Sequence, residues 1–372
     1  MSQEENDNYE KFDLKISPRK TVKVALLTGK IKGKKREEIL KQLKDGEIDI
    51  LVGTHALIED NVEFKDLGLA VIDEQHRFGV KQRLSLINKS QNADILSMTA
   101  TPIPRSLALT LYNDMDLSVI HEKPINRKEV ITSAISIDKY AELISKIKKI
   151  INETDDKIFW ICPLVEETEN MDLSNVSDKY EEFCDIFGKE KIAFIHGKLK
   201  ENEKNAIMED FCDKNSQKRI LIATTVIEVG IDIPQATLIV IEHPERLGLS
   251  QLHQLRGRVG RGDKQSYCIF LYDTAKMGHN SFQRLSIMKN TTDGFKISEE
   301  DLKMRGIGEV LGLKQSGSDE YKIADLDKNF DLFEVACQQA DKIIKNGNIK
   351  KYLLLLYLFD YVDFIKNREI LN

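Results

Sequence analysis

Residues 67–74 read LGLAVIDE, and this stretch decides the fold class. An almost continuously apolar run of six residues ends in two acidic residues, Asp73 and Glu74. Such a run is typical of a parallel strand that is buried on both faces and brings polar side chains to the carboxyl edge of its sheet, where ligands bind. Taken alone, the acidic pair is equally compatible with a plain turn after a strand.

Apolar runs of strand length alternate with segments of helical period around this stretch, which predicts an α/β fold with a mostly parallel sheet. The first expected strands are residues 24–27, 48–52, 67–72 and 95–98. A charged stretch at 122–127, with Pro124 and Asn126, indicates a linker. A helix at 140–151 and strands at 158–162, 192–195, 220–223, 238–241 and 267–271 are expected after it.

These patterns predict four parts. They are a flexible polar lead-in at 1–21, a first α/β domain at 22–122, a second α/β domain at 128–275, and a mostly helical region with several glycines at 276–372. A chain of 372 residues is long enough for two hydrophobic cores.

The composition, 41% apolar and 31% charged, is that of a soluble globular protein. The longest apolar run, 352–359, is far shorter than the roughly 20 residues that cross a bilayer, so we expect a docked helix, a cytoplasmic protein and no membrane partner.

Five scattered cysteines predict buried, reduced thiols rather than zinc ligands. The net charge of −6 excludes coating of nucleic acid by bulk electrostatics, so any DNA contact must be a local basic surface.

The acidic pair suggests a division of labour at a phosphate-transfer site. Asp73 can hold a magnesium ion through water, and Glu74 can orient and polarise an attacking water. The string Asp73-Glu74-Gln75-His76, followed by RFGV, resembles the Walker B motif of superfamily 2 helicases as it occurs in the RecG family. The resemblance implies a coupling role for His76, although a lone histidine after a strand is more often structural.

Further strings in the first domain are similar to the same family. Thr99-Ala100-Thr101-Pro102 resembles helicase motif III, whose hydroxyls relay between the nucleotide site and the DNA path. The resemblance also implies a DNA-contacting or coupling role for Gly53, Thr54 and His55.

The second domain carries two more such strings. Residues 223–234 resemble motif V and residues 251–262 resemble motif VI, in which Arg258 and Arg261 stand at the positions of arginine fingers. A guanidinium there can neutralise charge that develops on a transferred phosphoryl group, whereas the alternative is a solvated basic helix. The resemblance further implies nucleotide contacts by Gly230, Asp232 and Gln254, and DNA contact or coupling by Thr224 and Thr225.

His196-Gly197 and residues 242–248 match the family as well, and residues 301–306 and 312–317 resemble its translocation motif, with Arg305 and Gln315 central. A glycine-rich surface loop is the alternative for the last two strings. Together the strings cover most of residues 22–325. The resemblance implies two RecA-like domains, the first incomplete, and an ATP- and magnesium-dependent helicase that remodels branched or duplex DNA in repair and recombination.

The sequence contains no G-x-x-x-x-G-K-[ST] string, the loop that cradles phosphates through backbone amides and a lysine. The basic cluster 30–36 is interpreted instead as a solvated loop that leads into a helix at 37–43. In the RecG family the phosphate loop lies upstream, with a strand of the first sheet and a wedge domain. We therefore expect a truncated motor whose first sheet has unpaired edges and which needs a separate upstream fragment carrying that loop.

Two other functions stay open at this point. The chain could be a non-hydrolysing DNA-binding module or a gene remnant, or it could be the closely related motor of a transcription-repair coupling factor, which predicts an RNA polymerase partner.

Overall fold

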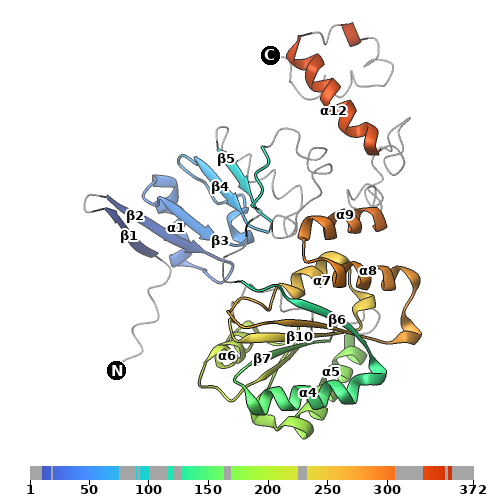
Figure 1. Ribbon diagram of the computed structural model, residues 1–372. Helices are drawn as coiled ribbons and strands as arrows, with labels where there is room; N and C mark the ends of the chain where they lie inside the picture. The colour runs from blue at the N-terminus through green and yellow to red at the C-terminus, as the bar shows by residue number, and fades with distance from the viewer. Residues whose placement is uncertain are drawn as a thin grey trace. The chain divides into compact units, whose positions relative to one another are not determined.

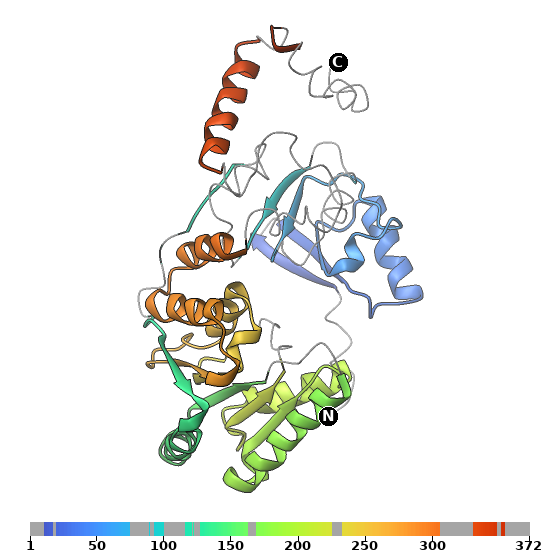
Figure 2. The ribbon, with the colours of Figure 1, turned by 90° about the vertical axis from the view of Figure 1, so that its right-hand side faces the viewer.

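The computed structural model describes residues 11–17, 20–74, 89, 93–99, 116–120, 122, 127–162, 169–224, 233–305, 330–347 and 351–353. The chain divides into two compact units, Met1–Ala100 and Thr101–Asn372, which are described separately (Figures 1 and 2). No helix in the described ranges is long and apolar enough to span a bilayer. Cys162, Cys184, Cys212 and Cys268 are free thiols, of which the first and last are buried.

The described residues of unit 1 form two groups of strands. Its elements are β1 (Lys11–Ser17), β2 (Lys20–Leu27), α1 (Lys34–Asp45), β3 (Ile50–Gly53), the 3-10 helix η1 (His55–Leu57), β4 (Leu69–Ile72) and β5 (Asp94–Ser97). The order β1-β2-β3 forms one sheet, with β1 antiparallel and β3 parallel to β2, and β4 pairs in parallel with β5. Helix α1 buries Ile39 and Leu43 against Ala25 and Leu27 of β2.

The first strand is a difference from the expectation of a flexible lead-in at 1–21. Residues 11–17 pair with β2 from Lys11 opposite Ala25 to Ser17 opposite Lys20. The segment KFDLKIS alternates apolar and polar residues, which is a strand pattern, but it is short and rich in charge. The charged composition of residues 11–17 led to the expectation of a flexible segment, whereas pairing with β2 makes them a strand.

Unit 2 is built on one six-stranded parallel sheet. Its strands are β6 (Ile131–Ser136), β7 (Lys157–Ile161), β8 (Ile192–Ile195), β9 (Ile220–Ala223), β10 (Ala236–Glu242) and β11 (Tyr267–Tyr272). They lie in the order β6-β11-β10-β7-β9-β8, and every neighbouring pair is parallel. All six carboxyl ends therefore meet at one edge of the sheet. Edge strand β6, which the sequence did not predict, is half polar (ITSAIS).

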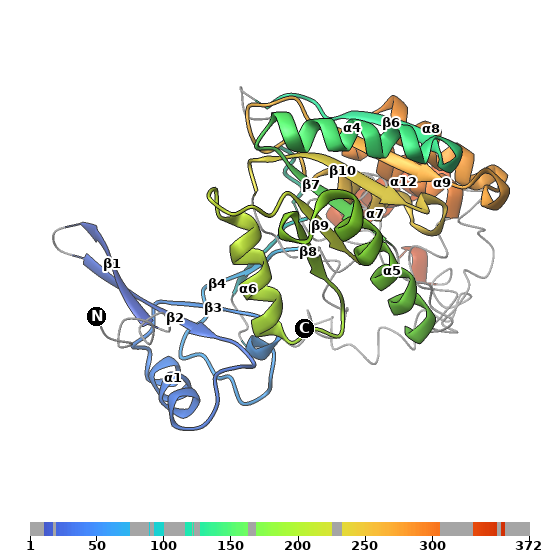
Figure 3. The same ribbon diagram turned by 90° about the horizontal axis from the view of Figure 1, so that it is seen from below.

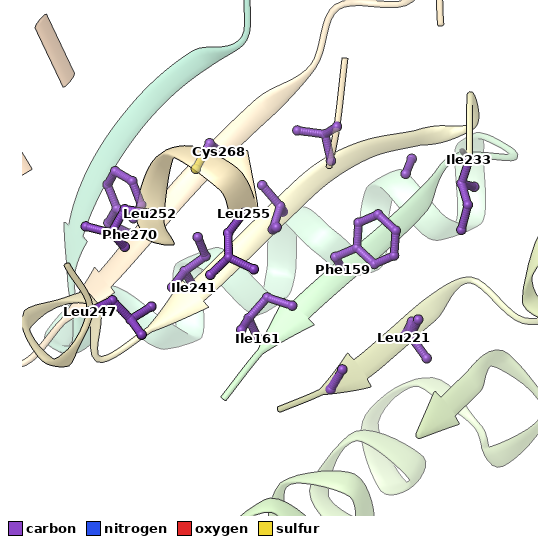
Figure 4. Close-up of a cluster of buried hydrophobic side chains, with 14 of the residues drawn as sticks. Phe159, Ile161, Leu221, Ile233, Ile241, Leu247, Leu252, Leu255, Cys268 and Phe270 are labelled. Atoms are coloured by element: carbon purple, nitrogen blue, oxygen red, sulfur yellow. The ribbon is translucent and has the colours of Figure 1, made fainter. Parts of the chain in front are cut away.

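Helices cover both faces of this sheet (Figures 1 and 3). They are α4 (Tyr140–Glu153), α5 (Glu169–Phe187), α6 (Glu201–Cys212), α7 (Leu249–Arg256), α8 (His279–Asn290) and α9 (Gly294–Arg305), with the 3-10 helices η3 (Ile137–Lys139), η4 (Lys189–Lys191), η5 (Pro244–Arg246) and η6 (Thr274–Lys276). Helices α4 and α5 pack on one face around Trp160, and α6 to α9 contribute to the core on the other face. Figure 4 shows Leu252 and Leu255 of α7 within this second core, near Phe270 and Ile241.

The C-terminal part is helical where it is described. Beyond α9, helix α12 spans Phe330–Lys345. The apolar run 352–359, expected to form a docked helix, lies mostly outside the described residues.

Candidate functional site

The predicted acidic pair follows β4 at the carboxyl edge of the β4–β5 pair. The φ angle of Glu74 is 50°, and its backbone N–H donates to Oδ1 of Asp73 at 2.9 Å. A non-glycine residue in this left-handed region costs on the order of 1–3 kcal/mol, and such residues cluster at functional sites. Asp73 is exposed and Glu74 is half-buried. A magnesium ion that keeps most of its waters and binds through one or two carboxylates fits this pair.

Thr99 lies at the same edge of unit 1 as the acidic pair. The backbone N–H of Met98 donates to the carbonyl of Ile72 at 2.8 Å, so the two strands end side by side. The structure thus brings Asp73, Glu74 and Thr99 together. Gln75, His76 and Thr101 lie outside the described residues.

Gly53, Thr54 and His55 end β3 and begin η1. A Cβ atom on Gly53 would lie 2.1 Å from the carbonyl oxygen of Leu27, so only glycine fits where β3 passes β2. Packing therefore accounts for this glycine. Thr54 and His55 are exposed beyond the strand end, where a ligand could reach them.

In unit 2, two predicted residues lie at the carboxyl ends of neighbouring strands. Thr224 follows β9 and is fully buried, and its Oγ1 has no hydrogen-bond partner among the described residues. His196 follows β8, and burial together with Lys204 and Lys198 holds the pKa of its imidazole below the ordinary value. Thr225, Gly230 and Asp232, from the same predicted motif V, lie outside the described residues.

Helix α7 presents the predicted motif VI. Its Leu249, Leu252 and Leu255 are buried in the core, which fixes the helix on the sheet. Arg256 is only 3% exposed, and its Nη1 donates to the carbonyls of Met288 (2.8 Å) and Thr291 (2.9 Å) at the end of α8. These bonds satisfy carbonyls that a helix end leaves unpaired. Arg256 therefore joins α7 to α8.

The segment after α7 carries Arg258, which is half-buried, and Arg261, which is exposed. Gly260 has a φ of 79°, and its carbonyl accepts a 2.8 Å hydrogen bond from Nε of Arg127. A Cβ on Gly262 would approach the carbonyl oxygen of Pro234 to 2.5 Å. The conformation of Gly260 and the close backbone packing at Gly262 thus set the path of the chain on either side of Arg261. Gln254, half-buried, lies on α7 beside them.

The α8–α9 pair contacts the loop that leads into α7. Nη1 of Arg284 donates to the carbonyl of Leu247 at 2.8 Å, and its Nη2 donates to that of Glu245 at 2.9 Å. Ser250 on α7 donates to Oδ2 of Asp301 on α9 at 3.0 Å. The predicted translocation residue Arg305 ends α9, although its side chain is not described, and Gln315 lies outside the described residues.

A partly buried polar network lies under the carboxyl ends of β7 and β10. The Nζ atom of Lys179 lies within 3.1–3.2 Å of carboxylate oxygens of Glu242 and Glu182 and of the hydroxyl of Tyr140, one acceptor for each ammonium hydrogen. Burial alone would lower the pKa of Lys179, but Glu242 and Tyr140 raise it above its ordinary value. The network ties α4 and α5 to the edge at which the strands that precede the predicted motifs end.

Sequence reasoning missed Arg127, Arg256, Arg284 and the Lys179 network. Arg256 lies within the predicted motif VI string, but nothing in the string indicates that its side chain bonds to the end of α8. Nothing in the sequence distinguishes Lys179 from a surface lysine on a helix, because its partners come from distant segments.

Comparisons with known proteins agree with this arrangement. Residues 6–110 match the family described as DEAD/DEAH box helicase, and residues 139–263 match the helicase conserved C-terminal domain. Residues 291–354 match the family described as ATP-dependent DNA helicase RecG, domain 3, C-terminal. The fold is similar to that of yeast Dbp5 bound to RNA and ADP BeF3, at 15% identity and a TM-score of 0.50, covering 75% of this chain and 74% of that one.

The relatives with high identity are RecG helicases. The chain is 48% identical over 324 residues to the ATP-dependent DNA helicase RecG of Bacillus subtilis, covering 87% of this chain and 47% of the relative. It is 46% identical over 349 residues to that of Aquifex aeolicus, covering 90% and 44%. A solved structure of RecG bound to a three-way DNA junction matches at 43% identity and a TM-score of 0.61, covering 84% of this chain and 39% of that one.

The fold and the matches on both units define the class as a helicase motor of RecA-like α/β domains. Within this class the chain belongs to the RecG family of ATP-dependent DNA helicases. It spans about half the length of these relatives.

Proposed function

We propose that this chain supplies the motor of an ATP-dependent DNA helicase or translocase that remodels branched DNA, such as stalled forks and recombination junctions, in repair and recombination. One observation carries the proposal: a glycine-shaped segment bearing Arg258 and Arg261 is fixed to the sheet by α7 and to α8 by Arg256. The similarity to a RecG bound to a three-way DNA junction supports branched DNA as the substrate. We further propose the cytoplasm as the place of action, as suits a relative of bacterial helicases.

The proposed chemistry is hydrolysis of the terminal phosphate of ATP. Asp73 would hold a magnesium ion through water, and the bound ion would supply positive charge that neutralises the phosphates, while Glu74 orients the attacking water. Arg258 and Arg261 stabilise the charge that develops on the transferred group, and Gln254, Gly230 and Asp232 contact the nucleotide. Thr99, Thr224 and Arg305 belong to the path that couples hydrolysis to DNA.

The sequence has no phosphate-binding loop string, so we propose that a segment outside it completes the nucleotide site. The same observation favours one second candidate, a DNA-binding module without turnover. The two differ in whether hydrolysis occurs when the loop is supplied.

The deciding experiment measures magnesium-dependent ATP hydrolysis by the purified chain, with and without branched DNA. It is repeated with an added fragment that carries the phosphate loop and with the Glu74→Gln variant. DNA-stimulated hydrolysis that needs Glu74 supports the motor. DNA binding without hydrolysis, even with the fragment present, would support the second candidate.

Arg256 and Arg258 lie two residues apart, but we expect substitution of the first to affect stability and substitution of the second to affect ATP hydrolysis. We expect Arg258→Ala to abolish turnover in the complemented enzyme while the affinity for DNA stays nearly unchanged. Arg256→Ala leaves the Met288 and Thr291 carbonyls without their donor and should lower the free energy of unfolding of unit 2 by about 2 to 4 kcal/mol. Urea titration, DNA anisotropy and ATPase assays measure the three quantities. If Arg258→Ala reduced DNA affinity as strongly as turnover, that arginine would be a backbone contact instead.

A further inference from the structure

Positive charge is concentrated in one part of unit 1. Residues 11–44 hold twelve lysines and arginines against three acidic residues, although the whole chain has a net charge of −6. This segment forms β1, β2 and α1, which lie together in one corner of the unit (Figure 1). The charge is therefore a local feature of the fold rather than a property of the composition.

Four exposed lysines stand between β2 and the first turn of α1: Lys30, Lys32, Lys34 and Lys35, here called the basic loop. Ile31, between the first two, is buried beneath α1, and its backbone N–H donates to the carbonyl of Thr28 at 3.1 Å. Anchoring Ile31 leaves Lys30 and Lys32 exposed on either side of it. The loop is held in place by the core, unlike a freely solvated segment.

Arg36, the fifth basic residue of this run, forms an ion pair within the unit. Nη2 of Arg36 lies 2.8 Å from Oε2 of Glu59, which follows η1, and this ion pair ties the start of α1 to the loop after β3. The exposed fraction of the Arg36 side chain is 15%. Arg36 thus has a structural role and is largely shielded from solvent, whereas the four lysines of the basic loop are exposed.

The basic loop also shares its edge of the sheet with the predicted DNA-contacting residues. Strands β2 and β3 are parallel, and Leu27 pairs with Gly53 at their carboxyl ends. The segments that follow, the basic loop after β2 and Thr54-His55 after β3, therefore leave the sheet at the same edge.

We infer that the basic loop is a contact surface for the phosphate backbone of DNA. Lysine ammonium groups bind phosphates as point charges and carry no base specificity, so this surface adds affinity and orientation rather than sequence preference. The inference rests on the proposed function, because it assumes a DNA partner. It revises the interpretation of residues 30–36 as a solvated loop.

The test measures binding of a fluorescent branched DNA to the full chain by anisotropy at several salt concentrations. Replacing the four lysines by glutamine should weaken binding at least about tenfold near 0.1 M salt. It should also lower the slope of log affinity against log salt by roughly 0.9 for each phosphate that the variant no longer neutralises. The matched control changes four exposed lysines of unit 2, Lys139, Lys146, Lys148 and Lys149, to glutamine and should alter affinity less than about twofold.

A second variant, which removes negative charge instead of positive charge, tests the same surface by a gain of DNA affinity rather than a loss. Glu37 and Glu38 follow the basic loop on α1 and are exposed, so changing both to glutamine should strengthen DNA binding severalfold. A damaged fold would not produce tighter binding.

The outcomes separate the two proposals. If the unsubstituted chain binds DNA and the basic-loop variant binds equally well with the same salt slope, the inference is overturned and the proposed function stands. If the unsubstituted chain does not bind branched DNA at about 50 mM salt, both fall. Binding of polyglutamate in preference to DNA would assign the loop to an acidic protein partner and overturn the inference.

Discussion

Both units contain apolar parallel strands, but they bury them differently. In β9 of unit 2 all four side chains are fully buried, from Ile220 to Ala223. In β4 of unit 1, Leu69 is 56% exposed and Val71 is 52% exposed, while Ala70 and Ile72 between them are buried. β3 and β5 alternate in a similar way, with the exposed residues Ile50, Val52 and Leu96. An apolar run thus specifies a strand, whereas burial of its second face depends on what packs there.

The largest expected effect sharpens this contrast. Phe183 on α5 is fully buried, with its ring centroid 4.8 Å from that of Trp160, and Phe183→Ala should lower the free energy of unfolding of unit 2 by about 3 to 5 kcal/mol. Leu69→Ala on the exposed face of β4 should cost less than about 0.5 kcal/mol. Peptide-resolved hydrogen exchange in increasing urea reports both units, and Trp160, the single tryptophan, gives an independent signal for unit 2.

A large loss of stability from Leu69→Ala would break the comparison. It would mean that another segment or a second copy of the chain covers this face in solution. Leu96→Ala on β5, which also carries an exposed side chain, is the matched repeat of the test.

A smaller effect is expected inside unit 1 itself. Gly53→Ala places a Cβ against the carbonyl oxygen of Leu27 and should cost about 1 to 3 kcal/mol, because backbone must move to make room. Gly29→Ala is the control, since no atom lies within 4 Å of the added Cβ and the residue is exposed. Exchange rates of the β2 and β3 amides measure both changes. Equal rates in the two variants would show that these strands separate readily.

The sequence predicted the regular part of the fold well. Strands β8 and β9 have the predicted bounds, and the helix expected at 140–151 is α4. Continuously apolar runs such as those of β8 and β9, whose side chains are almost all buried, leave few alternatives to a strand. Strands β1 and β6 were missed because their segments carry more polar residues (KFDLKIS and ITSAIS), whereas β8, which also ends its sheet, is apolar throughout (IAFI).

The sequence located the motifs of the candidate site but not the contacts that their side chains make. Glycine spacing located the segment between Arg258 and Arg261, but the sequence could not tell that Arg256, two residues earlier, is buried as a cap on α8. That distinction depends on carbonyls more than thirty residues away. Lys157 is a similar case, since its Nζ donates to the carbonyls of Phe211 and Asp213 and is fully buried.

The smallest expected effect concerns the two histidines that follow strands. His55 in unit 1 is exposed, whereas in unit 2 the Nδ1 atom of His196 is buried without a hydrogen-bond partner among the described residues. Burial, with Lys204 and Lys198 nearby, lowers the pKa of His196, so the folded state favours the neutral ring. Its contribution to stability is therefore present above the unfolded pKa of about 6.5 and is lost as pH falls through the lowered folded value.

Between pH 7.5 and pH 5.5, the free energy of unfolding of unit 2 should therefore fall more in the unsubstituted chain than in His196→Gln. Urea titrations followed by Trp160 fluorescence at both pH values measure the difference, which solvent screening keeps small because His196 is partly exposed. His55→Gln, the control in the other unit, should leave the pH dependence of unit 2 unchanged. An identical pH dependence in His196→Gln and the unsubstituted chain would contradict this prediction. It would mean that water reaches the His196 ring as freely as it reaches the exposed His55 ring, so the two histidines would not differ in solvation.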